Sequence, residues 1–146
     1  MSFFQPTRLA ALAILLLTWP TVVQANIGDT VEKLRGRYGS AKIVGNQMLF
    51  QHDGYSICVY FDGDKSGMEV YVRDGSIKDK TDITDEDIKA LLSKESESGG
   101  TNWAWIEKPM VSGKRVFLRS DGKLIARLSD GDRGGDKFFT IMLNTK

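Results

Sequence analysis

Short segments rich in aromatic and β-branched residues alternate with acid–glycine turns along most of this chain. Asp53-Gly54 and Asp121-Gly122 each stand between two such segments. An Asp-Gly pair favours a two-residue hairpin, because glycine adopts the positive φ that this turn requires. Hairpins join antiparallel strands, and the spacing leaves no room for the crossover helices of a parallel sheet. The sequence therefore predicts an antiparallel sheet.

The expected strands fall into two groups, each preceded by a short helix. Residues 29–38 and 84–94 have apolar residues at helical spacing, and Thr84 stands at a position suited to an N-cap. The expected strands are 47–51, 55–61 and 68–73 in the first group, and 102–108, 114–120, 123–130 and 137–144 in the second. We expect an α+β fold in which the two short helices pack on one face of the sheet.

The two groups repeat one order of elements, and each contains an Asp-Gly turn. This order is compatible with a tandem helix-plus-sheet duplication, with halves 26–80 and 81–146. The halves share little sequence, so a single α+β unit without duplication is the alternative.

The first 25 residues have a different composition from the rest. Arg8 precedes an unbroken apolar run at 9–17, and Val23 and Ala25 supply small residues just before Asn26. This order is typical of a secretory signal peptide. The run is also shorter than the roughly 20 apolar residues that span a bilayer. We predict cleavage after Ala25, a mature domain at 26–146, a secreted or periplasmic location and no integral membrane anchor. An uncleaved anchor and a buried N-terminal helix are the alternatives.

Charge and residue counts narrow the function classes. Without 1–25, which contain Arg8 as their one charged residue, 19 basic and 19 acidic residues remain and the net charge is zero. A neutral domain has no global attraction to nucleic acid. One cysteine and one histidine exclude an intramolecular disulfide framework and a histidine-cluster metal site. We expect no cofactor and no nucleic-acid partner.

The segment Gly28-Asp29-Thr30, with Leu34 and Tyr38-Gly39 after it, resembles a short signature that opens two exported families. These are the small outer-membrane-assembly lipoproteins of the OmlA type and the β-lactamase-inhibitor-like tandem proteins. In both, the Gly-x-Thr start caps a helix, the leucine packs inward and the glycine ends the helix. The chain lacks the lipid-accepting cysteine of the first family and the paired cysteines of the second. The resemblance implies a non-enzymatic protein that works by surface contact.

Basic and aromatic residues alternate in the C-terminal strands. The alternation places Arg115, Phe117 and Arg119 on one face of their strand, and we expect Arg127 to share that face from the next strand. Arginine with aromatic residues is enriched at protein interfaces. This set is therefore a candidate binding face, with an ordinary solvated sheet face as the alternative.

Two tryptophans, Trp103 and Trp105, lie two residues apart in an expected strand and so on one face. Paired tryptophans can stack on sugar rings or anchor a partner, and they can equally belong to a core.

Asp62, Asp64 and Ser66 match the opening of a calcium-binding loop. Alternate loop side chains can converge on one calcium ion. The position that should supply a bidentate glutamate is Arg73. A hydrated hairpin turn is the alternative.

These patterns favour an exported, non-catalytic binding protein with an envelope or extracellular protein partner. The alternative is a small secreted hydrolase that acts on cell-wall glycans through paired carboxylates near the two tryptophans. The motifs of serine hydrolases and phosphate-binding loops do not occur in the sequence.

Overall fold

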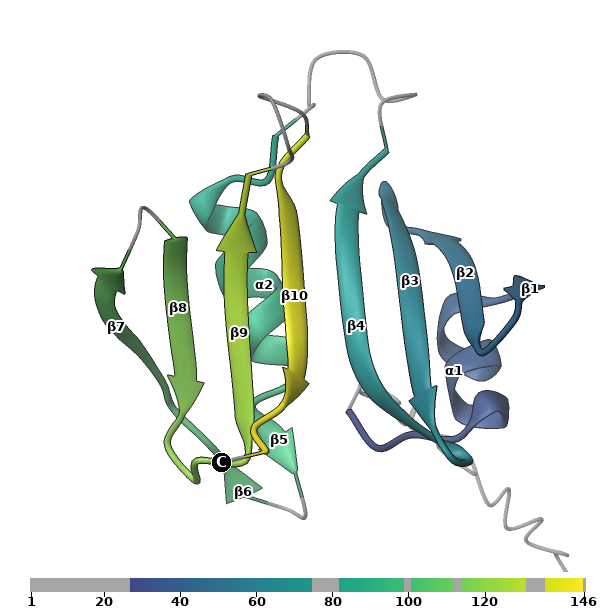
Figure 1. Cartoon of the computed structure of the whole chain (residues 1–146), viewed down its shortest axis with the longest axis horizontal. Helices are drawn as coiled ribbons and strands as arrows, with labels where there is room; N and C mark the ends of the chain where they lie inside the picture. The colour runs from purple at the N-terminus through teal and green to yellow at the C-terminus, as the bar shows by residue number, and fades with distance from the viewer. Residues whose placement is uncertain (1–26, 75–81, 99–100, 112–113, 131–135, 146) are drawn as a thin grey trace, which may run out of the picture.

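A computed structural model describes residues 27–74, 82–98, 101–111, 114–130 and 136–145. The expected leader at 1–25 lies outside these ranges. Eight strands form one antiparallel sheet in the order β1-β2-β3-β4-β10-β9-β8-β7 (Figure 1). They are β1 (Ala41–Val44), β2 (Gln47–His52), β3 (Tyr55–Asp62), β4 (Lys65–Arg73), β7 (Trp105–Val111), β8 (Lys114–Arg119), β9 (Leu124–Ser129) and β10 (Phe138–Leu143). A small separate hairpin pairs β5 (Glu97–Ser98) with β6 (Thr101–Asn102).

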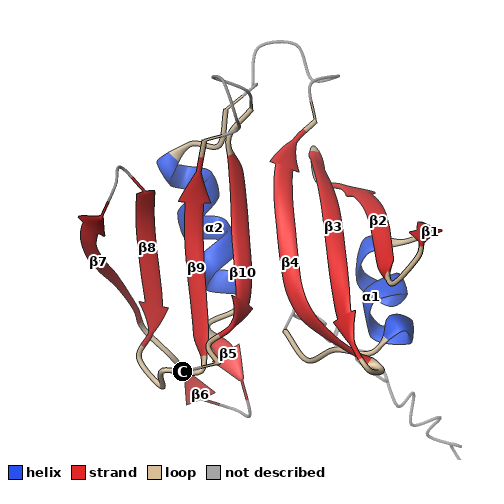
Figure 2. Ribbon diagram, viewed as in Figure 1, coloured by secondary structure: helices blue, strands red, loops and turns tan. Residues whose placement is uncertain are grey.

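The predicted α+β class is wrong, because the fold is predominantly antiparallel sheet (Figure 2). Strands make up 54% of the described residues, whereas α1 (Val31–Tyr38) has eight residues and α2 (Asp85–Lys94) has ten. Two helices of this length do not form a layer over eight strands. Both lie behind the sheet in Figure 1, and no described element covers its front face.

Each half of the sheet consists of four consecutive strands that follow a helix. The last strands of the two halves, β4 and β10, pair at the centre of the sheet, with Phe139 opposite Tyr71. The strand order therefore reads alike from both edges. A duplication with halves at 26–80 and 81–146 stays a prediction.

The predicted start of α2 is confirmed by a capping box. The Thr84 hydroxyl accepts a hydrogen bond from the Asp87 backbone N–H at 3.2 Å, and the Asp87 carboxylate accepts one from the Thr84 N–H at 2.9 Å. At α1, Thr30 occupies the N-cap position, and the carboxylate of the preceding residue, Asp29, accepts a hydrogen bond from the Arg37 guanidinium at 2.5 Å.

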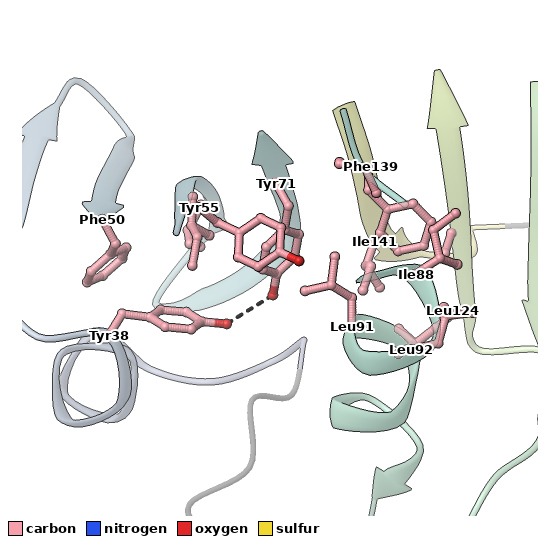
Figure 3. Packing of buried hydrophobic residues seen from close by; sticks show 14 of the residues in the cluster. Tyr38, Phe50, Tyr55, Tyr71, Ile88, Leu91, Leu92, Leu124, Phe139 and Ile141 are labelled. Carbon is pink, nitrogen blue, oxygen red and sulfur yellow. Dashed lines mark hydrogen bonds between the residues drawn. The ribbon is translucent and has the colours of Figure 1, made fainter. Parts of the chain in front are cut away.

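The hydrophobic core lies between the helices and the rear face of the sheet (Figure 3). Leu34 of α1 and Leu91 of α2 belong to one buried cluster with the sheet residues Phe50, Phe139 and Ile141. All five side chains are at most 2% exposed. Burying a side chain of this size contributes about 1.5–3 kcal/mol, so this layer holds the short helices in place.

Two local features set the register of the first four strands. The predicted Asp53-Gly54 turn is confirmed by φ values of 50° and 78°, and it places His52 opposite Tyr55. A bulge then shifts the pairing between β3 and β4. Tyr60 pairs with Met68, whereas Phe61, the next residue of β3, pairs with Ser66. The bulge leaves Gly67 without an opposite residue and turns the odd-numbered residues that follow it, from Glu69 to Arg73, toward the helices.

Candidate functional site

The front of the sheet, which we call the outer sheet face, carries a row of apolar side chains across six strands. Each of these residues lies opposite the next one on the neighbouring strand. The row consists of Tyr60, Met68, Met142, Ile125, Leu118 and Ile106. These side chains are half-buried by their neighbours, apart from Ile106, which is 48% exposed at the edge of the sheet. No described element covers them.

A second row runs beside the first on the same face. It consists of Leu49, Cys58, Val70, Thr140, Arg127 and Val116. Val72 and Phe138, which are opposite each other, extend the apolar area toward the other end of the strands. Contiguous apolar patches that no other element covers are typical of interaction sites, so this face is a candidate binding surface.

The charges on the outer sheet face are mainly positive. Asp62 pairs across the strands with Lys65 at the β3–β4 turn. Away from that turn, the alternation of the described strands places on this face the four cations Lys42, Lys108, Lys114 and Arg127, and no acid. All four are exposed. Arg127 lies within the second row, and Lys42 and Lys108 lie at its two ends, opposite Leu49 and Val116.

The expected grouping of Arg115 and Phe117 with Arg127 is wrong. Phe117 pairs with Ala126, and Arg115 pairs with Leu128. Directly opposite residues of an antiparallel pair point to the same face, so Arg115 and Phe117 face the helices while Arg127 lies on the outer sheet face. Phe117 is 5% exposed, and its ring centroid lies 6.1 Å from that of Phe139.

Arg115 forms ion pairs at the margin of the core. Its Nε donates to a Glu107 oxygen at 2.7 Å, its Nη1 contacts the Asp85 carboxylate, and its guanidinium lies 5.3 Å from the centroid of the Phe117 ring. The hydrogen bond from Arg115 lowers the pKa of Glu107. These contacts occupy the Arg115 side chain within the molecule.

The Arg119 side chain is buried and held by hydrogen bonds within the molecule. Its side chain is 4% exposed and makes two hydrogen bonds to Asp121, at 3.0 and 2.7 Å. Its Nη1 also donates to the Glu95 backbone oxygen at 2.8 Å. Of the four residues proposed for the binding face, Arg127 is the one that lies on the uncovered side.

The two tryptophans are not brought together as a pair on one strand. Trp105 begins β7, packs against the core and donates a hydrogen bond from its indole Nε1 to the Leu92 oxygen at 2.9 Å. Trp103 precedes the strand and is half-buried, and its backbone N–H donates to the Ser96 oxygen at 2.8 Å.

The three residues of the calcium hypothesis have different surroundings. Asp62 and Asp64 are exposed, whereas Ser66 is 1% exposed. The Ser66 hydroxyl accepts hydrogen bonds from the N–H groups of Gly28 at 3.0 Å and Asp29 at 3.2 Å, so it holds the N-terminal segment. Within the described ranges, no three His, Cys, Asp or Glu side chains are grouped to hold a metal ion.

A pocket of about 360 Å³ lies between the start of α1 and the β1–β2 turn. Its lining residues include Val31, Ile43, Met48 and Phe61, and none of them is titratable. This pocket offers no acid or base for catalysis.

A buried polar cluster behind β4 was not anticipated from the sequence. The Glu69 carboxylate, 1% exposed, accepts hydrogen bonds from the hydroxyls of Tyr71 at 2.5 Å and Tyr38 at 3.0 Å. Burial raises the pKa of Glu69, although the two hydroxyls and the Arg37 charge oppose the rise. The strand pattern alone gives no sign of this cluster, because its facing depends on the β-bulge.

Replacing Glu69 by glutamine is expected to weaken the pH dependence of stability. The raised pKa means that the folded chain binds more protons than the unfolded chain above pH ~4.3, so stability falls as pH rises through the folded-state pKa. In urea unfolding experiments, the free energy of unfolding of Glu69→Gln should fall less between pH 5 and pH 8 than that of the parent. Glu86→Gln, an exposed change on α2, should behave like the parent. An equal fall of the free energy of unfolding in all three chains would contradict the raised pKa of Glu69.

Neither described helix has the length and apolar character needed to cross a bilayer. No family model matches the sequence, and no curated protein matches it. Among solved structures, the fold is similar to a cysteine-rich secretory protein from Staphylococcus aureus subsp. aureus Mu50, with a TM-score of 0.41 and 12% identity. The match covers 82% of this chain and 44% of that chain, so this chain spans less than half the length of its neighbour.

Proposed function

We propose that this chain is an exported, non-catalytic interaction protein whose outer sheet face binds a protein partner. The observation that carries the proposal is the apolar row from Tyr60 to Ile106, with the partly apolar row beside it, across the uncovered face of the sheet. Export is supported by the leader pattern at 1–25, with cleavage after Ala25 and a secreted or periplasmic location.

The charges favour a partner that is apolar at its centre and acidic at its margin. Lys42, Lys108, Lys114 and Arg127 would face such acids and steer the encounter. A second copy of this chain is a poorer occupant, because a face-to-face dimer would bring two sets of these cations together. The apolar rows would supply the desolvated centre of the interface.

Photo-cross-linking from the face tests this proposal. A benzophenone amino acid at Met142, in the central row, should give one protein adduct in cells that export the chain. The same group at Lys33, exposed on α1 behind the sheet, should not give that adduct. An adduct of two copies of this chain, a lipid adduct, or no adduct specific to Met142 would contradict the proposal.

Binding measurements with the purified chain and its cross-linked partner then test the role of the charges. Reversing the charge at Arg127 and Lys108 should weaken binding at least tenfold, and the affinity of the parent should fall as salt rises. Lys33→Glu should change affinity by less than about twofold, because it lies outside the contact. Salt-independent binding would show that the partner is not acidic at its margin.

A further inference from the structure

The β1 strand forms one edge of the large sheet, at the far right of Figure 1. Among the described strands, only β2 pairs with it. Val44 and Gln47 flank the two-residue loop of the β1–β2 hairpin and lie opposite each other. Residues that flank such a loop exchange backbone hydrogen bonds, and bonded and non-bonded pairs alternate along the ladder. Ala41 and Ile43 therefore direct their N–H and C=O groups away from β2.

The opposite edge of the sheet is protected against a further strand. Its strand, β7, contains Pro109, which has no N–H to donate, and a bulge interrupts its pairing with β8 between Lys108 and Val111. Prolines and bulges are devices that prevent an edge from pairing with another chain. β1 contains no proline, and its pairing with β2 is regular. Its outward backbone groups can therefore pair with an added strand.

The apolar pocket lies beside the β1 edge. Ile43 of β1, Met48 of β2 and Phe61 of β3 line it from the sheet, and Val31 lines it from the start of α1. Ile43 pairs with Met48, so both side chains point to the rear of the sheet. Met48 is 3% exposed, whereas Ile43, on the edge strand, is 60% exposed. The volume of about 360 Å³ is sufficient for a large apolar side chain.

The charge on β1 favours an acidic neighbour. Lys42 is exposed on the outer sheet face, and residues 39–51 contain no acid. An acid opposite Lys42 on an added strand would form a favourable cross-strand pair, whereas a cation there would be repelled. A second copy of this chain is a poorer occupant, because a strand of four residues spans only about 13 Å. Stable dimers usually bury about 800 Å² per partner, which pairing of two such strands would not supply.

We propose that β1 binds an extended peptide segment of another protein, which pairs with this edge as an added strand and inserts one large apolar side chain into the pocket beside α1. The residue next to the inserted one is acidic, because successive side chains of a strand point to opposite faces, and Lys42 and Ile43 do so on β1. Backbone pairing supplies affinity and the pocket supplies specificity, as in other domains that bind peptides by strand addition. The pocket lies behind the sheet, so this site is additional to the outer sheet face.

Peptides selected by display on the purified exported chain test this site. A library of random seven-residue peptides should yield binders that place a large apolar residue next to an acid. Methylation of backbone nitrogens at alternate positions of the best binder then gives two probes with the same side chains. Fluorescence anisotropy should show a loss of affinity of about tenfold or more for the probe whose methylated nitrogens face β1. The other probe should bind like the unmodified peptide, because its methyl groups point away from the sheet.

Variants of the chain test the pocket with the same peptide. Val31→Phe should weaken binding about tenfold or more, because the added ring fills the pocket. Arg35→Phe, an exposed change on the same helix, and Phe138→Ala on the outer sheet face should each change affinity by less than about twofold.

Several results would overturn this proposal. They are the absence of any selected peptide, equal effects of the two methylated probes, and binding that Val31→Phe leaves unchanged. Loss of binding with Phe138→Ala would place the peptide on the outer sheet face instead. A dimer in sedimentation experiments that the peptide dissociates would show that a second copy occupies the edge.

Discussion

Replacing Phe139 by alanine is expected to lower the free energy of unfolding by about 3–5 kcal/mol. Phe139 is fully buried on β10, opposite Tyr71 of β4 and Leu128 of β9. Its removal leaves a cavity where the two halves of the sheet join, and the paired strands around it cannot collapse to fill it. Urea denaturation at neutral pH measures the loss.

The neighbouring residue provides a matched control. Phe138 lies on the same strand and on the outer sheet face, where it is half-buried. Phe138→Ala should cost about 1 kcal/mol, and under the proposed function it should weaken partner binding. Equal losses of stability at the two positions would contradict the assignment of the two sheet faces.

Replacing Asp87 by alanine is expected to cost about 3–5 kcal/mol as well, because it leaves a buried cation without its partner. The Asp87 carboxylate contacts the Arg73 guanidinium and accepts a hydrogen bond from the Tyr55 hydroxyl at 2.8 Å. It also completes the capping box with Thr84. One substitution therefore removes the Asp87 half of the capping box and the link between α2 and the sheet, whereas the bond from the backbone N–H of residue 87 to the Thr84 hydroxyl remains.

The control is Asp85→Ala in the same first turn of α2, where the side chain is 66% exposed. This change should stay within about 0.5 kcal/mol of the parent. Similar losses at positions 85 and 87 would show that the buried Arg73 contact contributes little.

The pH dependence provides a second readout for Asp87. Burial alone would raise its pKa, but hydrogen bonds from Thr84, Tyr55 and Arg73 outweigh burial and lower it. Its contribution is therefore present above the unfolded-state pKa of ~3.9 and is lost as pH falls through the folded-state value. The difference between the parent and Asp87→Ala should shrink on acidification.

The turn of the C-terminal hairpin is enough to predict which residues of its two strands share a face. A two-residue loop at Asp121-Gly122 implies that Phe117 is opposite Ala126, as the structure has it. Alternation predicts the correct sets of residues within each strand, but it does not show which set of one strand shares a face with which set of the next. That information comes from the pairing across the turn, which places Arg115 and Phe117 on the buried side.

The burial of Glu69 and Glu95 could not be predicted from the residues near them in the sequence. Glu69 faces the helices because of the bulge beside Gly67, and no residue pattern marked that bulge. Glu95 follows α2 in a polar, glycine-ended segment that resembles a loop, yet its carboxylate is held by Ile27, which is 68 residues away in the chain.

The sequence alone determined where the chain turns, where α2 begins and that its strands pair antiparallel. Asp53-Gly54 and the capping residue Thr84 act through bonds to near neighbours, so their effect can be read locally. Only the tertiary structure decided which side of each strand is buried and which acids enter the core. The reason is that side chains alternate with a period of two, so a one-residue shift in register exchanges the faces of a whole strand.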